Sequence, residues 1–223
     1  MNFTHFYKME RRITELEPLI LAIAKGRTEK SAIQLLKQMG IIFPDFHEDS
    51  RKLIFTSEDG KLKIIFVKAV DVPTYVEKGA ADMGISGKDN ILESLSDVYE
   101  LLDLKIGICK ISVAGPSGET TDSNRTLTIA SKYPNIAKKH FQRKGQPIET
   151  IKLNGSVELA PLIGLADYIV DIVETGNTLK ENGLAVIEDI DPISTRLIVN
   201  KASFATKSNE VQQFINQLQA VLE

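Results

Sequence analysis

The chain has 223 residues, of which 43% are hydrophobic and 26% are charged, and this composition excludes disordered and fibrous proteins. The formal net charge of −3 leaves no basic excess for nonspecific nucleic-acid binding, so an anionic ligand must be held by local groups. No segment approaches the ~20 apolar residues of a membrane span, and the charged N-terminus lacks the apolar core of a secretory signal. Cys109 is the single cysteine, which excludes an internal disulfide and fits a reducing cytoplasm.

Strands and helices alternate along the chain, which predicts α/β architecture with mostly parallel sheets. Apolar runs in the first half predict strands over 19–24, 51–55, 62–67 and 83–86. Thr28 is expected to cap a helix that ends at Gly40, and Asp71 to cap one that ends at Gly79. Gly87 then opens a further helix.

The second half repeats a strand–helix unit from residue 127 onward. Its predicted strands cover 127–130, 148–153, 168–173, 185–190 and 194–201. Its predicted helices cover 134–145, 156–163, 178–182 and 209–222. The polar segment 115–124 is expected to join two domains. We expect an N-terminal extension over 1–17, a first domain over 18–108 with 192–223, and a second domain over 109–191.

The segment from Asp171 to Thr178 lies between an apolar strand and a short helix. Unpaired backbone N–H groups and the hydroxyls of Thr175 and Thr178 at such a position suit a phosphate group. Asp171 and Glu174 would disfavour phosphate alone, so they indicate a ligand that also carries hydroxyls or a divalent metal. A ribose 5-phosphate group has this chemistry.

Ligands of α/β proteins bind beyond the carboxyl ends of the strands. Four loops have this position, at 25–27, 84–89, 153–158 and 174–177. Each contains glycine, which is common at turns, so none is diagnostic alone. Lys25 and Arg27 flank a helix start, where the helix dipole disfavours cations. A bound anion would remove that conflict, and an exposed, solvated pair of cations is the alternative.

Covalent nucleophile motifs, a Walker lysine and metal-ligand histidine spacing are all absent from the sequence. This absence predicts a reaction that depends on positioning the substrate and neutralising its charge, without a covalent intermediate.

Several segments, in this order, resemble the short form of ATP phosphoribosyltransferase, the first enzyme of histidine biosynthesis. The matching segments are 22–27, 71–77, 79–82, 84–89, 99–104, 151–162, 171–179 and 196–200. The resemblance implies a two-lobed fold like that of periplasmic binding proteins, with a cleft between the lobes. It implies transfer of phosphoribosyl from phosphoribosyl pyrophosphate to N1 of ATP, with Mg²⁺ as cofactor. It also implies a histidyl-tRNA synthetase-like regulatory subunit bound to a homodimer core.

Under this resemblance, Arg27 and Arg51 are the expected catalytic residues, because arginine suits the oxygens of a leaving pyrophosphate. The expected substrate-binding residues are Lys25, Gly26, Asp89, Glu158, Asp171, Glu174, Thr175, Gly176, Asn177 and Thr178. Asp89 and Glu158 are assigned to the adenine pocket. We expect no metal site formed by the protein alone, because Mg²⁺ would be held mainly through the substrate pyrophosphate.

Two alternatives stay open at this point. The chain could be a non-catalytic binding protein of the same architecture, because fold alone does not fix function. It could also be a phosphoribosyltransferase that acts on a different base.

Overall fold

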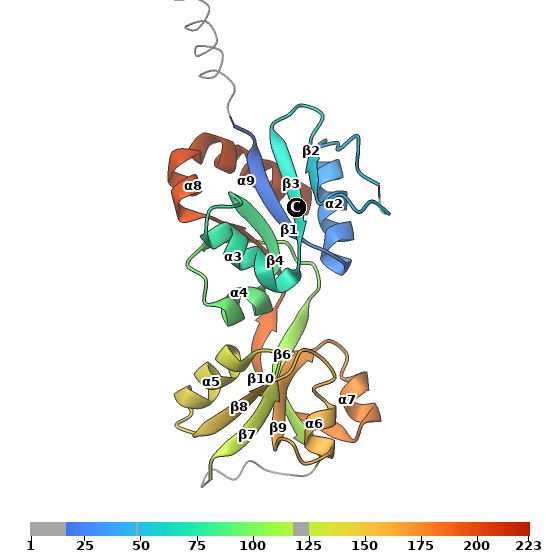
Figure 1. Ribbon diagram of the computed structural model, residues 1–223, viewed down its shortest axis with the longest axis vertical. Coiled ribbons are helices and arrows are strands. Elements are labelled where there is room, and N and C mark those ends of the chain that lie inside the picture. The colour runs from blue at the N-terminus through green and yellow to red at the C-terminus, as the bar shows by residue number, and fades with distance from the viewer. Residues whose placement is uncertain (1–16, 48, 118–124) are drawn as a thin grey trace, which may run out of the picture. The chain divides into compact units, whose positions relative to one another are not determined.

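The computed structural model describes residues 17–47, 49–117 and 125–223, apart from the side chain of Arg27 (Figure 1). The described residues form two compact units. Unit 1 contains the residues up to Ile85 together with Asp97–Leu102 and Leu197–Glu223, and unit 2 contains Ser86–Ser96 and Asp103–Arg196. These units differ in extent from the predicted domains, whose limits stay a prediction.

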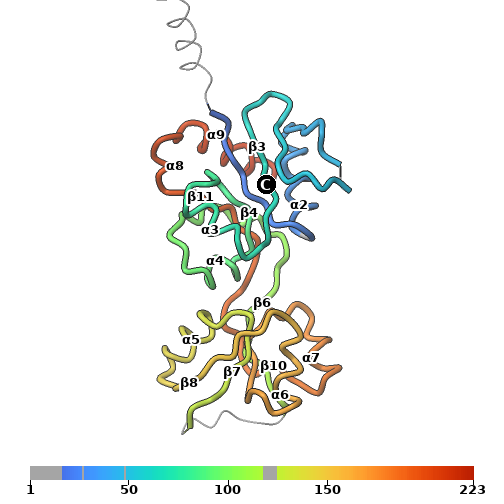
Figure 2. Tube along the Cα trace, viewed as in Figure 1, coloured from blue at the N-terminus to red at the C-terminus, as the bar shows by residue number. Residues whose placement is uncertain are grey.

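Unit 1 is built, in the described part of the chain, on a six-stranded sheet with the order β2-β3-β1-β4-β11-β5. Its strands are β1 (Leu19–Ala24), β2 (Ile54–Thr56), β3 (Leu62–Val67), β4 (Met83–Gly87), β5 (Tyr99–Asp103) and β11 (Thr195–Val199). Strand β1 runs parallel to β3 and β4, and β2 runs antiparallel to β3 (Figure 1). Figure 2 traces the path of the chain, with β3, β4 and β11 of this sheet labelled. Five of the six residues of β1 are buried, which explains its continuous apolar sequence.

The helices of unit 1 bury apolar faces with helical spacing. They are α2 (Arg27–Gln38), α3 (Val72–Glu77), α8 (Lys201–Thr206) and α9 (Ser208–Leu222). Helices α2 and α3 contact β1, and α9 contacts α2 and α8. On α2, Ala32 and Leu36 are one turn apart and both are buried.

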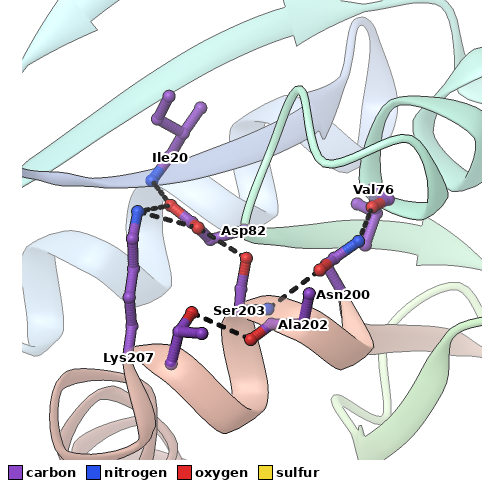
Figure 3. A network of polar contacts seen from close by, with 8 residues as sticks. Ile20, Val76, Asp82, Asn200, Ala202, Ser203 and Lys207 are labelled. Atoms are coloured by element: carbon purple, nitrogen blue, oxygen red, sulfur yellow. Dashed lines mark hydrogen bonds and ion pairs between the residues drawn. The ribbon is translucent and has the colours of Figure 1, made fainter.

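A buried polar network joins the C-terminal helices to the start of β1 and β4 (Figure 3). The Asp82 carboxylate accepts hydrogen bonds from the backbone N–H of Ile20 at 2.8 Å and from the Ser203 hydroxyl at 2.7 Å. Lys207 pairs with the same carboxylate. Asn200 caps α8, because its Oδ1 accepts a hydrogen bond from the backbone N–H of Ser203 at 2.9 Å. The carboxylate is therefore buried with its acceptor positions used.

Unit 2 is built, within the described residues, on a five-stranded sheet with the order β10-β6-β9-β7-β8. Its strands are β6 (Cys109–Pro116), β7 (Leu127–Ser131), β8 (Ile148–Lys152), β9 (Tyr168–Val173) and β10 (Leu184–Ile193). Strand β7 is parallel to β8 and β9, whereas β6 is antiparallel to β9 and β10. Its helices are α4 (Lys88–Ser94), α5 (Pro134–Arg143), α6 (Leu159–Leu162) and α7 (Asn177–Glu181).

Alternate residues of the unit 2 strands enter two separate hydrophobic clusters. Ile129 and Val170 pack with Phe141 of α5 in one cluster, while Ala130 and Ile169 pack in a second cluster that also contains residues of α6 and α7. Since successive side chains of a strand point to opposite faces, α5 covers one face of the sheet and α6 with α7 covers the other. Figure 1 shows this arrangement around β7 and β9.

Four predicted features are wrong in their details. The first is the strand over 51–55, which begins only at Ile54; before it, the Ser50 hydroxyl accepts a hydrogen bond from the backbone N–H of Lys52. The helix predicted over 156–163 is limited to Leu159–Leu162. The helix expected to be capped by Thr28 has Gly26 at its N-cap.

The fourth is the segment 115–124, which does not join the two units. Strand β6 continues to Pro116, and both β6 and β7 belong to unit 2. Position 115, inside β6, requires glycine because a Cβ there would come within 2.4 Å of the Tyr168 ring. Residues 118–124 lie outside the described part of the chain.

Asp71 stands at the N-cap of α3, as predicted, but its side chain makes no capping hydrogen bond. The predicted extension over 1–17 lies outside the described residues, apart from Glu17. No helix in the described ranges is both long enough and apolar enough to cross a membrane.

Candidate functional site

The loop after β9 contains the predicted phosphate-binding residues. Gly176, with φ of 76°, occupies the N-cap of α7 in the left-handed region that favours glycine. The side chains of Glu174, Thr175, Asn177 and Thr178 are exposed. The Thr175 hydroxyl accepts one long hydrogen bond, from the backbone N–H of Asn177 at 3.4 Å. The loop thus presents hydroxyl, amide and carboxylate groups to solvent at the carboxyl end of a strand.

Asp171 lies on β9 opposite Ser112 of β6, and it is half-buried, unlike the loop that follows it. Burial raises the pKa of Asp171, and the negative charges of Glu158 and Asp89 raise it further. A hydrogen bond from the backbone of Ile172 and the charge of Lys132 act in the opposite direction. The charges of Glu158 and Asp89 therefore act on Asp171 within unit 2, although the three residues lie on separate segments of the sequence.

Asp89 is the most buried of these carboxylates, with 6% of its surface exposed. It stands in the first turn of α4. Its Oδ2 accepts a hydrogen bond from the Tyr133 hydroxyl at 2.9 Å and another from the Asn90 side-chain amide at 3.0 Å. The charge of this buried group is therefore stabilised by two donors, as a buried charge requires.

Glu158 stands at the N-cap of α6, where it makes no side-chain capping hydrogen bond. The turn before it contains Ser156, a non-glycine residue with φ of 49°. That conformation is uncommon for a residue with a side chain. The side chain of Glu158 is half-buried, and its charge acts on Asp171.

The predicted cationic residues belong to unit 1. Gly26 has φ of 105° at the N-cap of α2, and its backbone N–H donates to the Glu29 carboxylate at 3.2 Å. Lys25 is exposed, and its backbone N–H donates to the Val67 carbonyl at 2.9 Å. The side chain of Arg27 lies outside the described part of the structure, so the catalytic role of this residue stays a prediction.

Arg51 is exposed and precedes β2. Two residues later, the Leu53 carbonyl accepts a hydrogen bond from the backbone N–H of Phe66 at 2.9 Å. Because Lys25 bonds to the next residue, Val67, the backbones of both cationic segments converge on the carboxyl end of β3. Backbone geometry thus places the two predicted groups of cations at one edge of this sheet.

Sequence reasoning missed Ser131, the last residue of β7, and Tyr133, two residues after it, at the same kind of position as the predicted loops. Ser131 donates its hydroxyl proton to the Val170 carbonyl at 2.5 Å and accepts the backbone N–H of Tyr133 at 2.7 Å. This turn contains no glycine, and glycine is the feature that the four predicted loops share, so the turn was not predicted as part of the site. Its place at the end of a predicted strand was the available signal.

Within the described ranges, no group of three His, Cys, Asp or Glu side chains is arranged to hold a metal ion. The chemistry that these residues offer is phosphate binding, acceptance of hydroxyl hydrogen bonds and charge neutralisation.

The fold is similar to that of a periplasmic aliphatic sulphonate binding protein, SsuA from Escherichia coli. The TM-score is 0.57 with 12% identity, covering 93% of this chain and 69% of that one. At this identity the likeness establishes the fold alone. The two α/β units thus have a periplasmic-binding-protein-like fold, as predicted.

Two proteins with higher sequence identity to this chain belong to one family. A solved ATP phosphoribosyl transferase (HisG:HisZ) complex from Thermotoga maritima has a chain with a TM-score of 0.82 and 39% identity, covering 92% of this chain and 98% of that one. An ATP phosphoribosyltransferase from Oceanobacillus iheyensis is 59% identical over 207 residues, covering 93% of this chain and 100% of the relative. The sequence profile of ATP phosphoribosyltransferase matches residues 68–220. This chain therefore belongs to the ATP phosphoribosyltransferase family.

Proposed function

We propose how the residues of this chain divide the work of its family's reaction. That reaction, the first step of histidine biosynthesis, moves a phosphoribosyl group from phosphoribosyl pyrophosphate to N1 of ATP and releases pyrophosphate. The observation that carries the assignment is the loop after β9, where exposed hydroxyls follow the half-buried Asp171.

The segment Thr175–Thr178 would hold the 5-phosphate. Its hydroxyls and backbone N–H groups are donors, and phosphate oxygens accept from such groups. Gly176 allows the close approach of backbone to ligand, since it has no side chain and a positive φ. Glu174, at the exposed start of the loop, has a weaker role at the sugar or the metal.

Asp171 would accept hydrogen bonds from the ribose hydroxyls. Mg²⁺ is commonly held by one or two carboxylates together with substrate phosphates, and Asp171 on β9 and Glu174 directly after this strand are two candidate carboxylates. When bound, the ion would neutralise charge on the pyrophosphate. We therefore assign Mg²⁺ to the substrate, with Asp171 as the main protein contact.

The cations of unit 1 would stabilise the leaving pyrophosphate. Positive charge develops at the sugar carbon while the pyrophosphate gains negative charge, so fixed cations lower the barrier. We assign this role to Arg27 and Arg51, with Lys25 holding the same group. The exposed position of Lys25 and Arg51 leaves them accessible to an anion.

Asp89 and Glu158 remain our assignment for the adenine pocket. N1 of adenine is a lone-pair nucleophile, so its attack needs no strong base. This accounts for a scheme without a catalytic histidine.

We also propose a partner, a homodimer core and a cytoplasmic location. The Thermotoga maritima structure is a HisG:HisZ complex. By likeness to it, this chain would work with a histidyl-tRNA synthetase-like regulatory subunit. The subunit would be required for feedback inhibition by histidine.

The deciding experiment mixes the purified chain with ATP, phosphoribosyl pyrophosphate and Mg²⁺, with and without the synthetase-like subunit, and measures phosphoribosyl-ATP by mass spectrometry. Product in either mixture supports the proposal. Binding without turnover in both mixtures would favour a non-catalytic binding protein. Turnover with another base, but none with ATP, would favour a different phosphoribosyltransferase.

A further inference from the structure

We propose that Tyr133 is a positioning residue of the substrate site, whose hydroxyl fixes the Asp89 carboxylate so that Asp171 is free to accept the ribose hydroxyls. The inference rests on the proposed function of Asp171. All three residues belong to unit 2 and come from α4, β9 and the turn after β7.

The Tyr133 hydroxyl is a buried donor with one defined acceptor. The residue is 2% exposed, and its hydroxyl lies 2.9 Å from Asp89 Oδ2. A tyrosine hydroxyl in such a position is costly to leave unpaired, and so is the buried carboxylate opposite it. The bond therefore defines the orientation of the Asp89 side chain.

The turn that carries Tyr133 is anchored beside Asp171. Ser131 is fully buried and links the backbone N–H of Tyr133 to the carbonyl of Val170. Val170 immediately precedes Asp171 on β9. A shift of the tyrosine relative to Asp171 would break one of these two short hydrogen bonds.

Charge explains why this position matters to Asp171. Burial raises the pKa of Tyr133 strongly, and the charges of Asp89, Asp171 and Cys109 raise it further, so the hydroxyl keeps its proton. Asp89 and Asp171 carry like charges, and the charge of each raises the pKa of Tyr133. A phenol that donates to Asp89 stabilises one of these charges and leaves Asp171 available to a ligand.

A merely structural role for this hydrogen bond is less well supported, because α4 and α5 have other links. The Glu93 carboxylate accepts the backbone N–H groups of Asn135 at 2.9 Å and of Ile136 at 3.1 Å. The Asn135 side-chain amide also donates to the Glu93 carbonyl at 2.9 Å. Attachment of the two helices therefore does not depend on the tyrosine hydroxyl.

The test is Tyr133→Phe, which deletes the hydroxyl and keeps the ring. We expect the KM for phosphoribosyl pyrophosphate to rise about tenfold, the size of a lost hydrogen bond to a charged group. We expect kcat to change less than about threefold, because the hydroxyl does not touch the reacting atoms. In an Asp89→Asn background, Tyr133→Phe should add little, because the charge that it stabilises is gone.

Tyr168→Phe is the matched control, because Tyr168 belongs to the same buried cluster and loses a hydroxyl in the same way. It should keep the wild-type KM. An equal rise in both variants would overturn the inference, since general loosening would then explain it. If Tyr133→Phe is active and has the same KM as the wild type, the inference is overturned but the proposed function stands. If the wild-type chain itself forms no phosphoribosyl-ATP, the proposed function is overturned, and the inference with it.

Discussion

The Lys207 ammonium lies 2.9 Å from Oδ1 and 3.0 Å from Oδ2 of the Asp82 carboxylate, so it contacts both oxygens. The Asp82 side chain is 7% exposed and the Lys207 side chain 29% exposed. This pair links the residue before β4 to the turn between α8 and α9. It therefore makes the two C-terminal helices part of the core of unit 1.

Asp82→Asn should destabilise unit 1 by about 3 kcal/mol, because it leaves the partly buried Lys207 without an opposite charge. The same substitution weakens the bonds from Ile20 and Ser203, which now meet a neutral side chain. Urea unfolding followed by circular dichroism measures the difference in the free energy of unfolding.

Asp45→Asn is the control for that measurement. Asp45 pairs with Lys52 at 3.1 Å, but their side chains are 76% and 52% exposed. Exposed pairs contribute little, so the change should stay below about 1 kcal/mol. Equal effects for Asp45 and Asp82 would contradict a structural role for the buried pair.

The sequence predicts β1, β3 and β9 well because these strands have near-continuous apolar runs, whereas the interior strand β6 (Cys109–Pro116) is not predicted. The ranges 19–24, 62–67 and 168–173 agree with β1, β3 and β9. The element boundaries that fail, such as 51–55, depend on local side-chain hydrogen bonds that hydrophobicity does not encode. Helix α8 is not predicted at all; it is six residues long, and its cap, Asn200, also bonds to the distant Val76 carbonyl.

Much of the candidate site also follows from sequence, since loops at the carboxyl ends of strands can be located from strand predictions. The link between Tyr133 and Asp89 could not be found in this way. The two residues are 44 positions apart, and their hydrogen bond depends on α4 joining unit 2 although β4, just before it, lies largely in unit 1. Such a juxtaposition is a property of tertiary packing, which periodicity does not report.

Arg51→Ala should lower kcat by ~10²–10³, the usual effect of removing one donor that stabilises transition-state charge. Because Arg51 is exposed, the free energy of unfolding should change little. Lys52→Ala is a matched control, since the neighbouring cation is already paired with Asp45. Steady-state kinetics with both substrates will decide, and near-normal turnover in Arg51→Ala would remove this residue from the mechanism.

Gly176→Ala should raise the KM for phosphoribosyl pyrophosphate. The rise should exceed any rise in KM that the loss of stability alone causes. A side chain at φ of 76° is strained by about 1–2 kcal/mol, and it would also crowd the backbone that is assigned to the 5-phosphate. Gly183→Ala, on the far side of α7, has a similar φ of 71° and open space around its Cβ. Both variants should lose similar stability in thermal melts, but a shared rise in KM would argue against the phosphate-binding loop.

Asp171→Asn should weaken binding of phosphoribosyl pyrophosphate and, at neutral pH, stabilise the folded chain. Burial, followed by the charges of Glu158 and Asp89, raises the pKa of Asp171 above its ordinary value of 3.8. The folded chain then binds this proton more tightly than the unfolded chain, so the wild type loses stability as the pH rises above 3.8. The asparagine variant carries no such charge, and its advantage should grow with pH.

Asp189→Asn, on the same sheet, should change the pH dependence of stability in the opposite direction. A hydrogen bond from Lys110, followed by one from Ser112, lowers the pKa of Asp189, so this carboxylate contributes stability above pH 3.8 that is lost as the pH falls. Its asparagine variant should be less stable than the wild type at pH 7 and should approach it in acid. Urea unfolding of all three proteins between pH 3 and pH 7 measures both trends. The difference in the free energy of unfolding between Asp171→Asn and the wild type could also stay constant with pH. That result would show that the charge of Asp171 does not destabilise the folded chain, and it would contradict the role given to burial of this carboxylate.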